Sequence, residues 1–512
     1  MGLDTSKESY RIRRACVQVL ACFVFVCVYF VGIFPGAPDA NQRSHYQLLR
    51  ALGERGTAEI GPELRDLGSH SDVAAHNGRR FSNKGPGLSV AALPAYWTLR
   101  RFLPAPASSQ DWLVFYGARL LSVTLVVSLA LLVFVRQALR IAPPPPLLPL
   151  WLFALLFATP FQVYARSFFS HGFVAALVFL SFTLTVHDHG LLPAAAAGFL
   201  AAAAVATEYP LAVIVLCLLI AAAARGPGVR LAAFLSGAAL PTAALGWYHN
   251  HYFGSVFAFP PAASESYPLL AGRGIAGISW PTPAAALGLF LDPAHGLLYF
   301  SPFMILWPLV AIVSLRKLRS DPSLLAPALG PLLLLLVIAG FLPPHWRGGW
   351  CLGPRYLVPG FLLVFWLFVV RIPKGGRPVA QLLLFAAVVY GATMIAVCGS
   401  TFWMIPYESW NPARTIAAHF LRSGIVEYNL GVAAGLPALL SLAPPIAACA
   451  IAFFAAAHGA AVRARTLAAA ILLGLLGVGA ALSIPPTPAA VTNSHRDGLA
   501  SVLLPAMRAG WH

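Results

Sequence analysis

The chain has 512 residues, of which 59% are hydrophobic and only 10% are charged, and its mean hydropathy is +0.76. A soluble globular protein carries about 25% charged residues, so this composition excludes an ordinary soluble domain and predicts an all-α, polytopic membrane protein. The formal net charge of +17 would suggest nucleic acid in a soluble chain. Basic residues collected in short cytoplasmic loops explain it better here, and no nucleic-acid partner is expected.

The N-terminus combines a basic segment with an apolar run. Residues 1–14 contain Lys7, Arg11, Arg13 and Arg14, and the run from Ala15 to Phe34 follows. This run is too long for the apolar core of a signal peptide. It predicts an uncleaved anchor with a cytoplasmic N-terminus.

Further apolar runs, bounded by charged residues or by Pro and Gly, follow along the chain. With the anchor they predict about 13 transmembrane helices of roughly 20 residues each. The predicted segments are 15–34, 112–135, 147–165, 169–187, 191–206, 210–224, 231–252, 297–315, 323–342, 356–370, 378–400, 433–457 and 464–484.

The basic residues between these segments indicate the orientation. The groups at 136–140, 225–230, 316–319, 371–377 and 463–465 all fall on the side of the N-terminus, as the positive-inside rule requires in a cytoplasmic membrane. The longer loops, 35–111, 253–296, 343–355 and 401–432, are then external (periplasmic). We expect one membrane domain over residues 1–484 and a short external tail over 485–512.

The first external loop, 35–111, contains amphipathic segments. Apolar residues recur at helical spacing from Tyr46 to Leu52 and from Ile60 to Leu67, which predicts two short helices lying in the membrane interface. The apolar stretch 88–99 is short and ends at Arg100 and Arg101. We expect it to form a re-entrant or interfacial helix.

Two acidic residues of this loop are candidates for proton transfer. Asp39 follows the first span closely, where a partly desolvated carboxylate can act as a general base; it can equally cap the following helix. Asp72 has the same ambiguity. With His70 and His76 it also forms a set of potential ligands for a divalent metal, although three such residues often occur together by chance.

Two more ionisable residues lie at external positions. Lys84 precedes Gly-Pro-Gly, and its ammonium group is suited to a phosphate; the alternative is a lysine that reaches lipid headgroups. Glu208 is followed by Tyr-Pro at a junction between two predicted spans. A carboxylate there either lines a cavity or reaches interfacial water.

Taken together, these features resemble the GT-C superfamily of polytopic glycosyltransferases. The shared features are an acid directly after the first span, two interfacial helices and an aromatic-x-x-Lys turn, Phe81 to Lys84. The protein O-mannosyltransferase and aminoarabinose transferase branch, with related RgtA/B/C/D-like enzymes, is the most similar. Further segments similar to this branch are Tyr164–Gly172, Asn250–Ser255, Gly296–Pro302 and Trp346–Leu357.

The resemblance implies a reaction and roles for individual residues. A sugar would move from a polyprenyl-phosphate-linked donor to a lipid, glycan or protein acceptor, with inversion, on the external face. Asp39 and Asp72 would be the catalytic carboxylates, and Asp39, as the base, would deprotonate the acceptor hydroxyl or orient it. The implied phosphate ligands are Lys84, Arg355 and Arg166, and the implied substrate-binding residues are His171, His345, Trp346, Trp350 and Tyr46.

Other functions stay open at this point. A transporter or flippase of lipid-linked saccharides, a non-catalytic scaffold and an O-antigen-type ligase or polymerase all suit a polytopic chain. Trp346 and Trp350 suit a sugar-binding wall, but also an ordinary interface anchor. A divalent metal is possible, and no cofactor is firmly predicted.

Overall fold

The structure is a computed structural model. It describes residues 2–32, 39–103, 111–188, 190–226, 228–266, 277–341, 343, 345–374, 376–485, 496–498 and 500–501. The predicted external tail, 485–512, therefore lies almost entirely outside the described residues.

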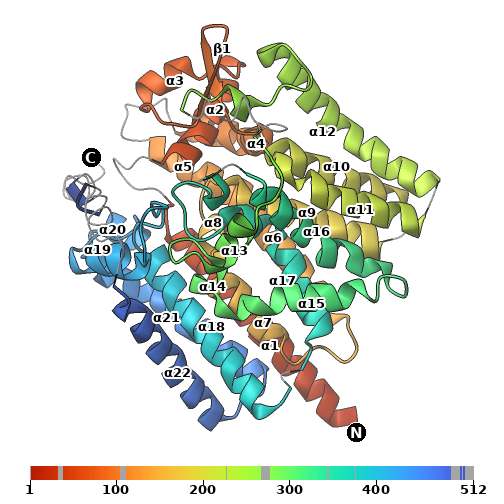
Figure 1. Cartoon of the computed structure of the whole chain (residues 1–512), viewed down its shortest axis with the longest axis vertical. Helices are drawn as coiled ribbons and strands as arrows, with labels where there is room; N and C mark the ends of the chain where they lie inside the picture. The colour runs from red at the N-terminus through yellow and green to blue at the C-terminus, as the bar shows by residue number, and fades with distance from the viewer. Residues whose placement is uncertain are drawn as a thin grey trace.

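Helices dominate the described chain (Figure 1). The α-helices are α1 (Gly2–Tyr29), α2 (Ala40–Arg55), α3 (Gly61–Asp66), α4 (Gly87–Phe102), α5 (Asp111–Arg119), α6 (Leu125–Leu139), α7 (Leu148–Phe157), α8 (Phe161–Ala165), α9 (Ser170–His187), α10 (Leu191–Thr207), α11 (Ala212–Arg225), α12 (Val229–Phe253), α13 (Pro283–Leu291), α14 (Leu297–Phe300), α15 (Leu306–Leu315), α16 (Leu325–Ala339), α17 (Phe361–Arg371), α18 (Pro378–Gly399), α19 (Ala418–Arg422), α20 (Leu430–Ala433), α21 (Ala443–Gly459) and α22 (Ala464–Ser483).

Short 3₁₀ and π turns join or extend these helices. Those that matter below are η1 (Leu120–Thr124), which makes α5 and α6 continuous, η2 (Tyr209–Leu211), η7 (His345–Arg347), η8 (Arg355–Gly360), η9 (Ala413–Ala417) and η10 (Leu440–Leu442). Two strands, β1 (Val73–His76) and β2 (Arg79–Ser82), complete the described elements.

Every predicted membrane segment contains a helix, and the all-α, polytopic fold class is confirmed. Eight helices of the described chain are long and apolar enough to cross a membrane. Shorter apolar helices occupy several other predicted segments, so the total number of crossings stays a prediction. Several boundaries differ from the prediction. The segment predicted at 433–457 becomes a regular helix only at Ala443, because Gly435 has a φ of +85° and Pro437 follows it closely. The segment predicted at 297–315 is interrupted between α14 and α15.

Helices α2, α3 and α4 form, with the β1–β2 hairpin, a layer at the end of the molecule opposite the start of α1 (Figure 1). We call it the distal layer. The helices agree with the predicted interfacial segments. The hairpin was not predicted. Its turn is Asn77-Gly78, with φ of 49° and 73°, and such a pair of positive φ angles is what a tight two-residue hairpin turn requires.

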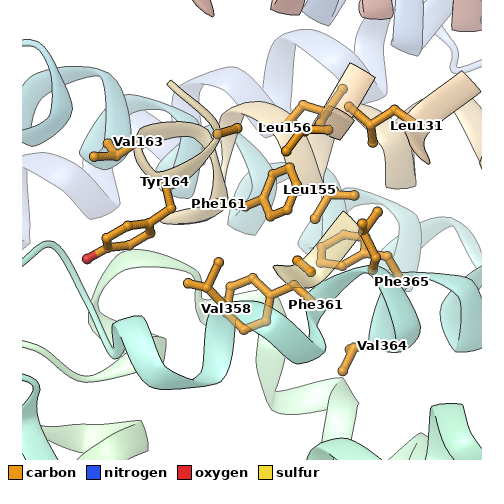
Figure 2. Close-up of a cluster of buried hydrophobic side chains, with 14 of the residues drawn as sticks. Leu131, Leu155, Leu156, Phe161, Val163, Tyr164, Val358, Phe361, Val364 and Phe365 are labelled. Carbon is orange, nitrogen blue, oxygen red and sulfur yellow. The ribbon is translucent and has the colours of Figure 1, made fainter. Parts of the chain in front are cut away.

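The core lies between the central helices. All residues of α7 are buried. Its side chain Leu155 lies next to Phe361 and Phe365 of α17, whereas Leu156 lies toward Leu131 of α6 (Figure 2). Tyr164 lies at the edge of this cluster, and its hydroxyl points away from the apolar side chains to donate a 2.9 Å hydrogen bond to the carbonyl of Leu352. The core thereby holds the Tyr164–Gly172 segment against the loop that leads to Arg355.

Candidate active site

An ion pair beneath the distal layer is the starting point of the site. Lys84 Nζ lies 3.0 Å from Asp72 Oδ2, and both side chains are largely buried. Burial alone would raise the pKa of Asp72, but Lys84 and Arg355 outweigh it and lower the pKa of this carboxyl. The Lys84 turn and the distant Arg355 loop therefore converge on one carboxylate.

Arg355 is a buried cation without a paired carboxylate among the described residues. Its guanidinium lies over the rings of Tyr356 and Phe169, with 4.9 and 5.7 Å to the ring centroids, and it donates a 3.2 Å hydrogen bond to the hydroxyl of Tyr356. Its Nε has no hydrogen-bond partner in the described chain. A buried donor left unsatisfied is costly, so the arrangement favours an anion at this position.

Two buried histidines stand beside these cations. His45 comes from α2 and His171 from α9; Lys84 and Arg355 lie near both rings. Burial, followed by Lys84, lowers the pKa of His45 to about 3, so its ring is neutral at pH 7. Both nitrogens of His45 and Nε2 of His171 are buried and lack hydrogen-bond partners in the described part of the chain.

Glu208 completes this group from the junction of α10 and η2. Its carboxylate accepts a hydrogen bond from Ser170, and Lys84, Arg355 and Asp72 are near. Burial raises the pKa of Glu208, against the opposing effects of Ser170 and the two cations. We call Asp72, Lys84, Arg355, His45, His171 and Glu208 the Lys84–Arg355 cluster.

The glycines after Lys84 serve close packing. A Cβ on Gly85 would lie 2.6 Å from the carbonyl oxygens of Ala206 and Thr207, and one on Gly87 would lie 2.1 Å from Thr207 Oγ1. Since only a residue without a side chain fits there, the turn lies directly on the end of α10. This contact brings Lys84 next to Glu208.

Asp39 forms the N-cap of α2. Its Oδ1 accepts a 3.1 Å hydrogen bond from the backbone N–H of Gln42, and its Oδ2 accepts a short bond from the Gln42 side chain. Burial raises the pKa of Asp39 from 3.8 to about 6, against the opposing effect of these bonds. The capping interpretation is thus realised, and the buried carboxylate still ionises near neutral pH.

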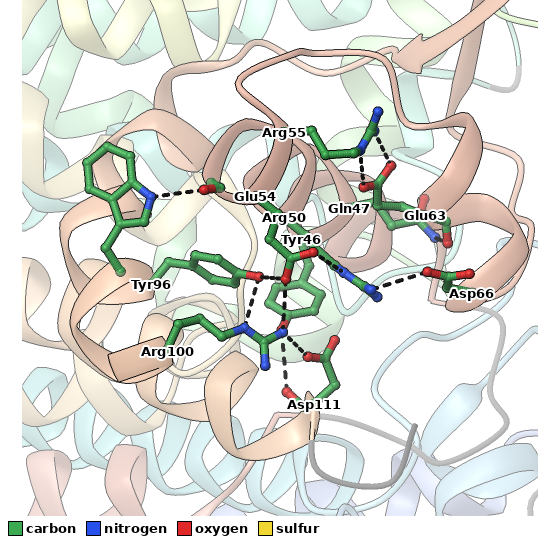
Figure 3. A network of polar contacts seen from close by, with 12 residues as sticks. Tyr46, Gln47, Arg50, Glu54, Arg55, Glu63, Asp66, Tyr96, Arg100 and Asp111 are labelled. Atoms are coloured by element: carbon green, nitrogen blue, oxygen red, sulfur yellow. Dashed lines mark hydrogen bonds and ion pairs between the residues drawn. The ribbon is translucent and has the colours of Figure 1, made fainter. Parts of the chain in front are cut away.

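Tyr46 lies in a different network, which ties α2 to α4 and α5 (Figure 3). Its hydroxyl donates to the carbonyl of Asp111 over 3.4 Å. Arg100 pairs with the Asp111 carboxylate and donates a 3.0 Å bond to Tyr96, whose hydroxyl donates a 2.5 Å bond to Glu54. The structure therefore places Tyr46 among contacts that hold the distal layer together.

Arg166 makes its contacts away from the Lys84–Arg355 cluster. Its guanidinium lies 2.7 Å from the Glu427 carboxylate and 3.9 Å from the ring centroid of Phe30. It also lines, with Gln162, a mostly apolar cavity of about 450 Å³ between α1, α18 and α21. The residues that line this cavity are Val26, Phe30, Phe157, Gln162, Arg166, Ala392, Ala396, Val397, Ser400, Leu421, Arg422, Leu439, Leu442, Pro445, Ile446 and Cys449.

The predicted aromatic wall follows α16 in the chain. Trp346 is buried in η7, where it packs so closely that a Cβ on Gly288 of α13 would lie 2.3 Å from its ring. His345 and Trp350, which are close to Trp346 in the sequence, are half-buried. Burial lowers the pKa of His345. These contacts place Trp346 against α13.

The potential metal ligands of the first loop separate. His70 lies 2.9 Å from Gln47 and accepts a 3.1 Å bond from the backbone N–H of Asp72, whereas the His76 ring packs on Phe253, 5.9 Å between centroids. Within the described ranges, no group of three or more His, Cys, Asp or Glu side chains is placed to hold a metal ion.

Sequence reasoning left His45 out of the site and gave Glu208 no firm place in it. Asp39, Gln42 and His45 follow one another at three-residue spacing, and all are buried; buried polar side chains at such a spacing are a signal for a site. Glu208 joins the site because the Gly85 turn packs on the end of α10. No local sequence pattern predicts this contact.

Comparisons with known proteins find similarity at the level of solved structures. No protein-family model matches the chain, and no curated protein matches it. Two solved structures of ArnT from Cupriavidus metallidurans are similar over 91% of this chain and 77% of theirs. The apo structure has 14% identity and a TM-score of 0.45, and the structure bound to undecaprenyl phosphate has 15% identity and a TM-score of 0.48.

Proposed function

We propose that the chain is a membrane glycosyltransferase that uses a polyprenyl-phosphate-linked sugar as donor. The observation that carries the proposal is the buried Arg355 guanidinium, which has no carboxylate partner in the described chain and lies close to Lys84 and two imidazoles with unpartnered nitrogens. A phosphate group is the natural occupant of such a site, because it accepts several charge-assisted hydrogen bonds at once.

The chemistry follows from the position of the cations. In sugar transfer the bond between the anomeric carbon and the phosphate oxygen breaks through an oxocarbenium-like state, and negative charge grows on the departing phosphate. Lys84 and Arg355 would stabilise that charge, and each donor of this kind contributes about 3 kcal/mol in comparable sites. Arg166 would contact the donor where the donor extends into the cavity that Arg166 lines.

Asp39 is the proposed acceptor-side carboxylate. Its pKa of about 6 leaves it ionised at pH 7, so it can deprotonate the acceptor hydroxyl or orient it. Asp72, which pairs with Lys84, would position that cation. His345, Trp346 and Trp350 remain proposed contacts of the sugar or acceptor.

The location of the ionisable groups favours transfer over transport. A transporter needs such groups along a path through the bilayer, whereas the cluster forms where Asp72 and Lys84, which flank the β1–β2 hairpin, meet the Arg355 loop and the end of α10. We place this cluster on the external side of the cytoplasmic membrane, from the distribution of basic loops.

The test is a deletion strain of the source cell. Its glycoconjugates are compared with those of the parent by mass spectrometry, and the missing conjugate identifies sugar and acceptor. We expect the wild-type gene to restore the conjugate and Arg355→Ala to fail, with both proteins present in the membrane at equal levels. Arg80→Ala, which removes an exposed arginine of β2 that pairs with Glu265, is the matched control. An unchanged glycoconjugate profile on deletion would refute the proposal.

A further inference from the structure

The Lys84–Arg355 cluster contains a chain of hydrogen bonds that the phosphate site does not use. Ser170, the first residue of α9, is fully buried. Its hydroxyl donates to Glu208 Oε1 and lies 3.5 Å from Nδ1 of His171. Glu208, Ser170 and His171 thus form a continuous line from the end of α10 into the cluster.

With Glu208 ionised, the donors and acceptors in this line favour one tautomer of His171. An ionised carboxylate only accepts, so the single hydroxyl proton of Ser170 goes to Glu208. The Ser170 oxygen can then only accept from His171, which places the imidazole proton on Nδ1. Nε2 consequently carries a lone pair, and it is this nitrogen that is buried and unpartnered in the described structure.

The free nitrogen lies next to the proposed phosphate site. The His171 ring shares Tyr356 and Phe169 with the Arg355 guanidinium, at 5.6 and 6.0 Å between ring centroids. The anomeric carbon of a sugar phosphate is one oxygen away from the phosphorus, so a group beside the phosphate is also beside the reacting carbon. The charged groups that act on the Asp39 carboxyl are Arg43 and Asp72, of which only Asp72 belongs to the cluster.

We infer that His171 is the proton acceptor of the transfer reaction, held and polarised by Ser170 and Glu208; this rests on the proposed function. The acceptor oxygen forms a bond to the anomeric carbon as the bond from that carbon to the phosphate oxygen breaks. The bonding electrons stay on the phosphate between Lys84 and Arg355. The acceptor's hydroxyl proton moves to His171 Nε2, and Glu208 offsets the resulting charge through Ser170.

The surroundings of His171 decide when it can take a proton. The charges of Lys84 and Arg355 act on the His171 ring, and His45 is also near; the rings of Tyr164 and Tyr356 flank it. A bound anionic phosphate offsets the charges of Lys84 and Arg355 and so favours transfer of a proton to this ring. In this account His171 is a catalytic residue, Ser170 and Glu208 are positioning residues, and Asp39 orients the acceptor.

The test measures transfer and its pH dependence in purified variants. The donor is the polyprenyl-phosphate-sugar fraction of the parent cells, and membranes of the deletion strain supply the acceptor. We expect His171→Gln to lower kcat by about 10²- to 10⁴-fold, the usual contribution of a general base, while binding of polyprenyl phosphate persists. Glu208→Gln keeps an oxygen for Ser170 but loses the charge, so kcat falls and the acid limb of the pH profile moves to lower pH. Ser170→Ala moves the same limb.

Two comparisons make the outcome decisive. His249→Gln removes another buried imidazole, which lies 3.0 Å from the Tyr209 hydroxyl, and should leave both kcat and the acid limb unchanged. Wild-type kcat in His171→Gln, or an acid limb near pH 6 that only Asp39→Asn removes, would overturn the relay and leave the proposed function standing. If the wild type transfers no sugar at all, the proposed function fails, and the relay fails with it.

Discussion

At the scale of single residues, Asp39 combines two roles that substitution can separate. Asp39→Asn keeps a side-chain oxygen for the N-cap of α2, whereas Asp39→Ala loses the cap, which costs about 1 kcal/mol. We therefore expect both variants to transfer sugar more slowly, but only Asp39→Ala to melt earlier. Thermal unfolding in detergent and a transfer assay check this prediction. Full activity of purified Asp39→Asn would show that the carboxylate takes no part in the reaction.

The raised pKa of Asp39 also predicts how stability changes with pH. Because folding raises this pKa from 3.8 to about 6, the folded state holds the proton more tightly, and the contribution of Asp39 to stability declines as the pH rises from about 4 to 6. The full effect is at most about 3 kcal/mol. Asp39→Asn should flatten this part of the stability profile, measured by unfolding at a series of pH values; equal slopes in both proteins would contradict the assignment.

At the scale of elements, the contact between the Lys84 turn and α10 decides the geometry of the cluster. Gly85→Ala would force backbone atoms apart, because its Cβ would lie 2.6 Å from two carbonyl oxygens. We expect about 1–3 kcal/mol of destabilisation and a loss of phosphate binding as Lys84 moves away. The matched control is Gly246→Ala in α12, where a Cβ meets no atom within 4 Å. Polyprenyl phosphate binding at the wild-type level in Gly85→Ala would contradict this view.

The sequence predicts elements better than it predicts their contacts. Hydropathy located the long helices, because each spans many apolar residues in a row. It misplaced the start of α21, where Gly435 and Pro437 interrupt an equally apolar run. The hairpin was missed although Asn77-Gly78 is a strong turn signal, since the histidines around it suggested metal ligation instead. The sequence leaves the role of Glu208 open between a cavity and interfacial water, because its neighbours in space come from distant segments of the chain.

At the scale of the whole molecule, the Arg166–Glu427 pair joins early and late parts of the chain. Both side chains are buried, and breaking such a pair by removing one partner costs about 3–5 kcal/mol, whereas replacing both is often tolerated. Arg166→Met should thus destabilise the protein strongly, and Arg166→Met combined with Glu427→Gln should recover much of that loss. Thermal unfolding of the single and double variants tests this coupling; purely additive losses would contradict it.

The cluster as a whole rests on five separate segments: the Lys84 turn, α2, the start of α9, the end of α10 and the Arg355 loop. Its charges can bind a phosphate together only if all five segments meet, so one anion should contact them jointly.

Binding of a short-chain polyprenyl phosphate to the purified full-length protein tests this claim most directly. We predict saturable binding to the wild type, weakened at least about tenfold in both Lys84→Ala and Arg355→Ala, the loss expected when about 1.4 kcal/mol is removed, and unchanged in Arg80→Ala. Equal affinity in the wild type, Lys84→Ala and Arg355→Ala would contradict the account.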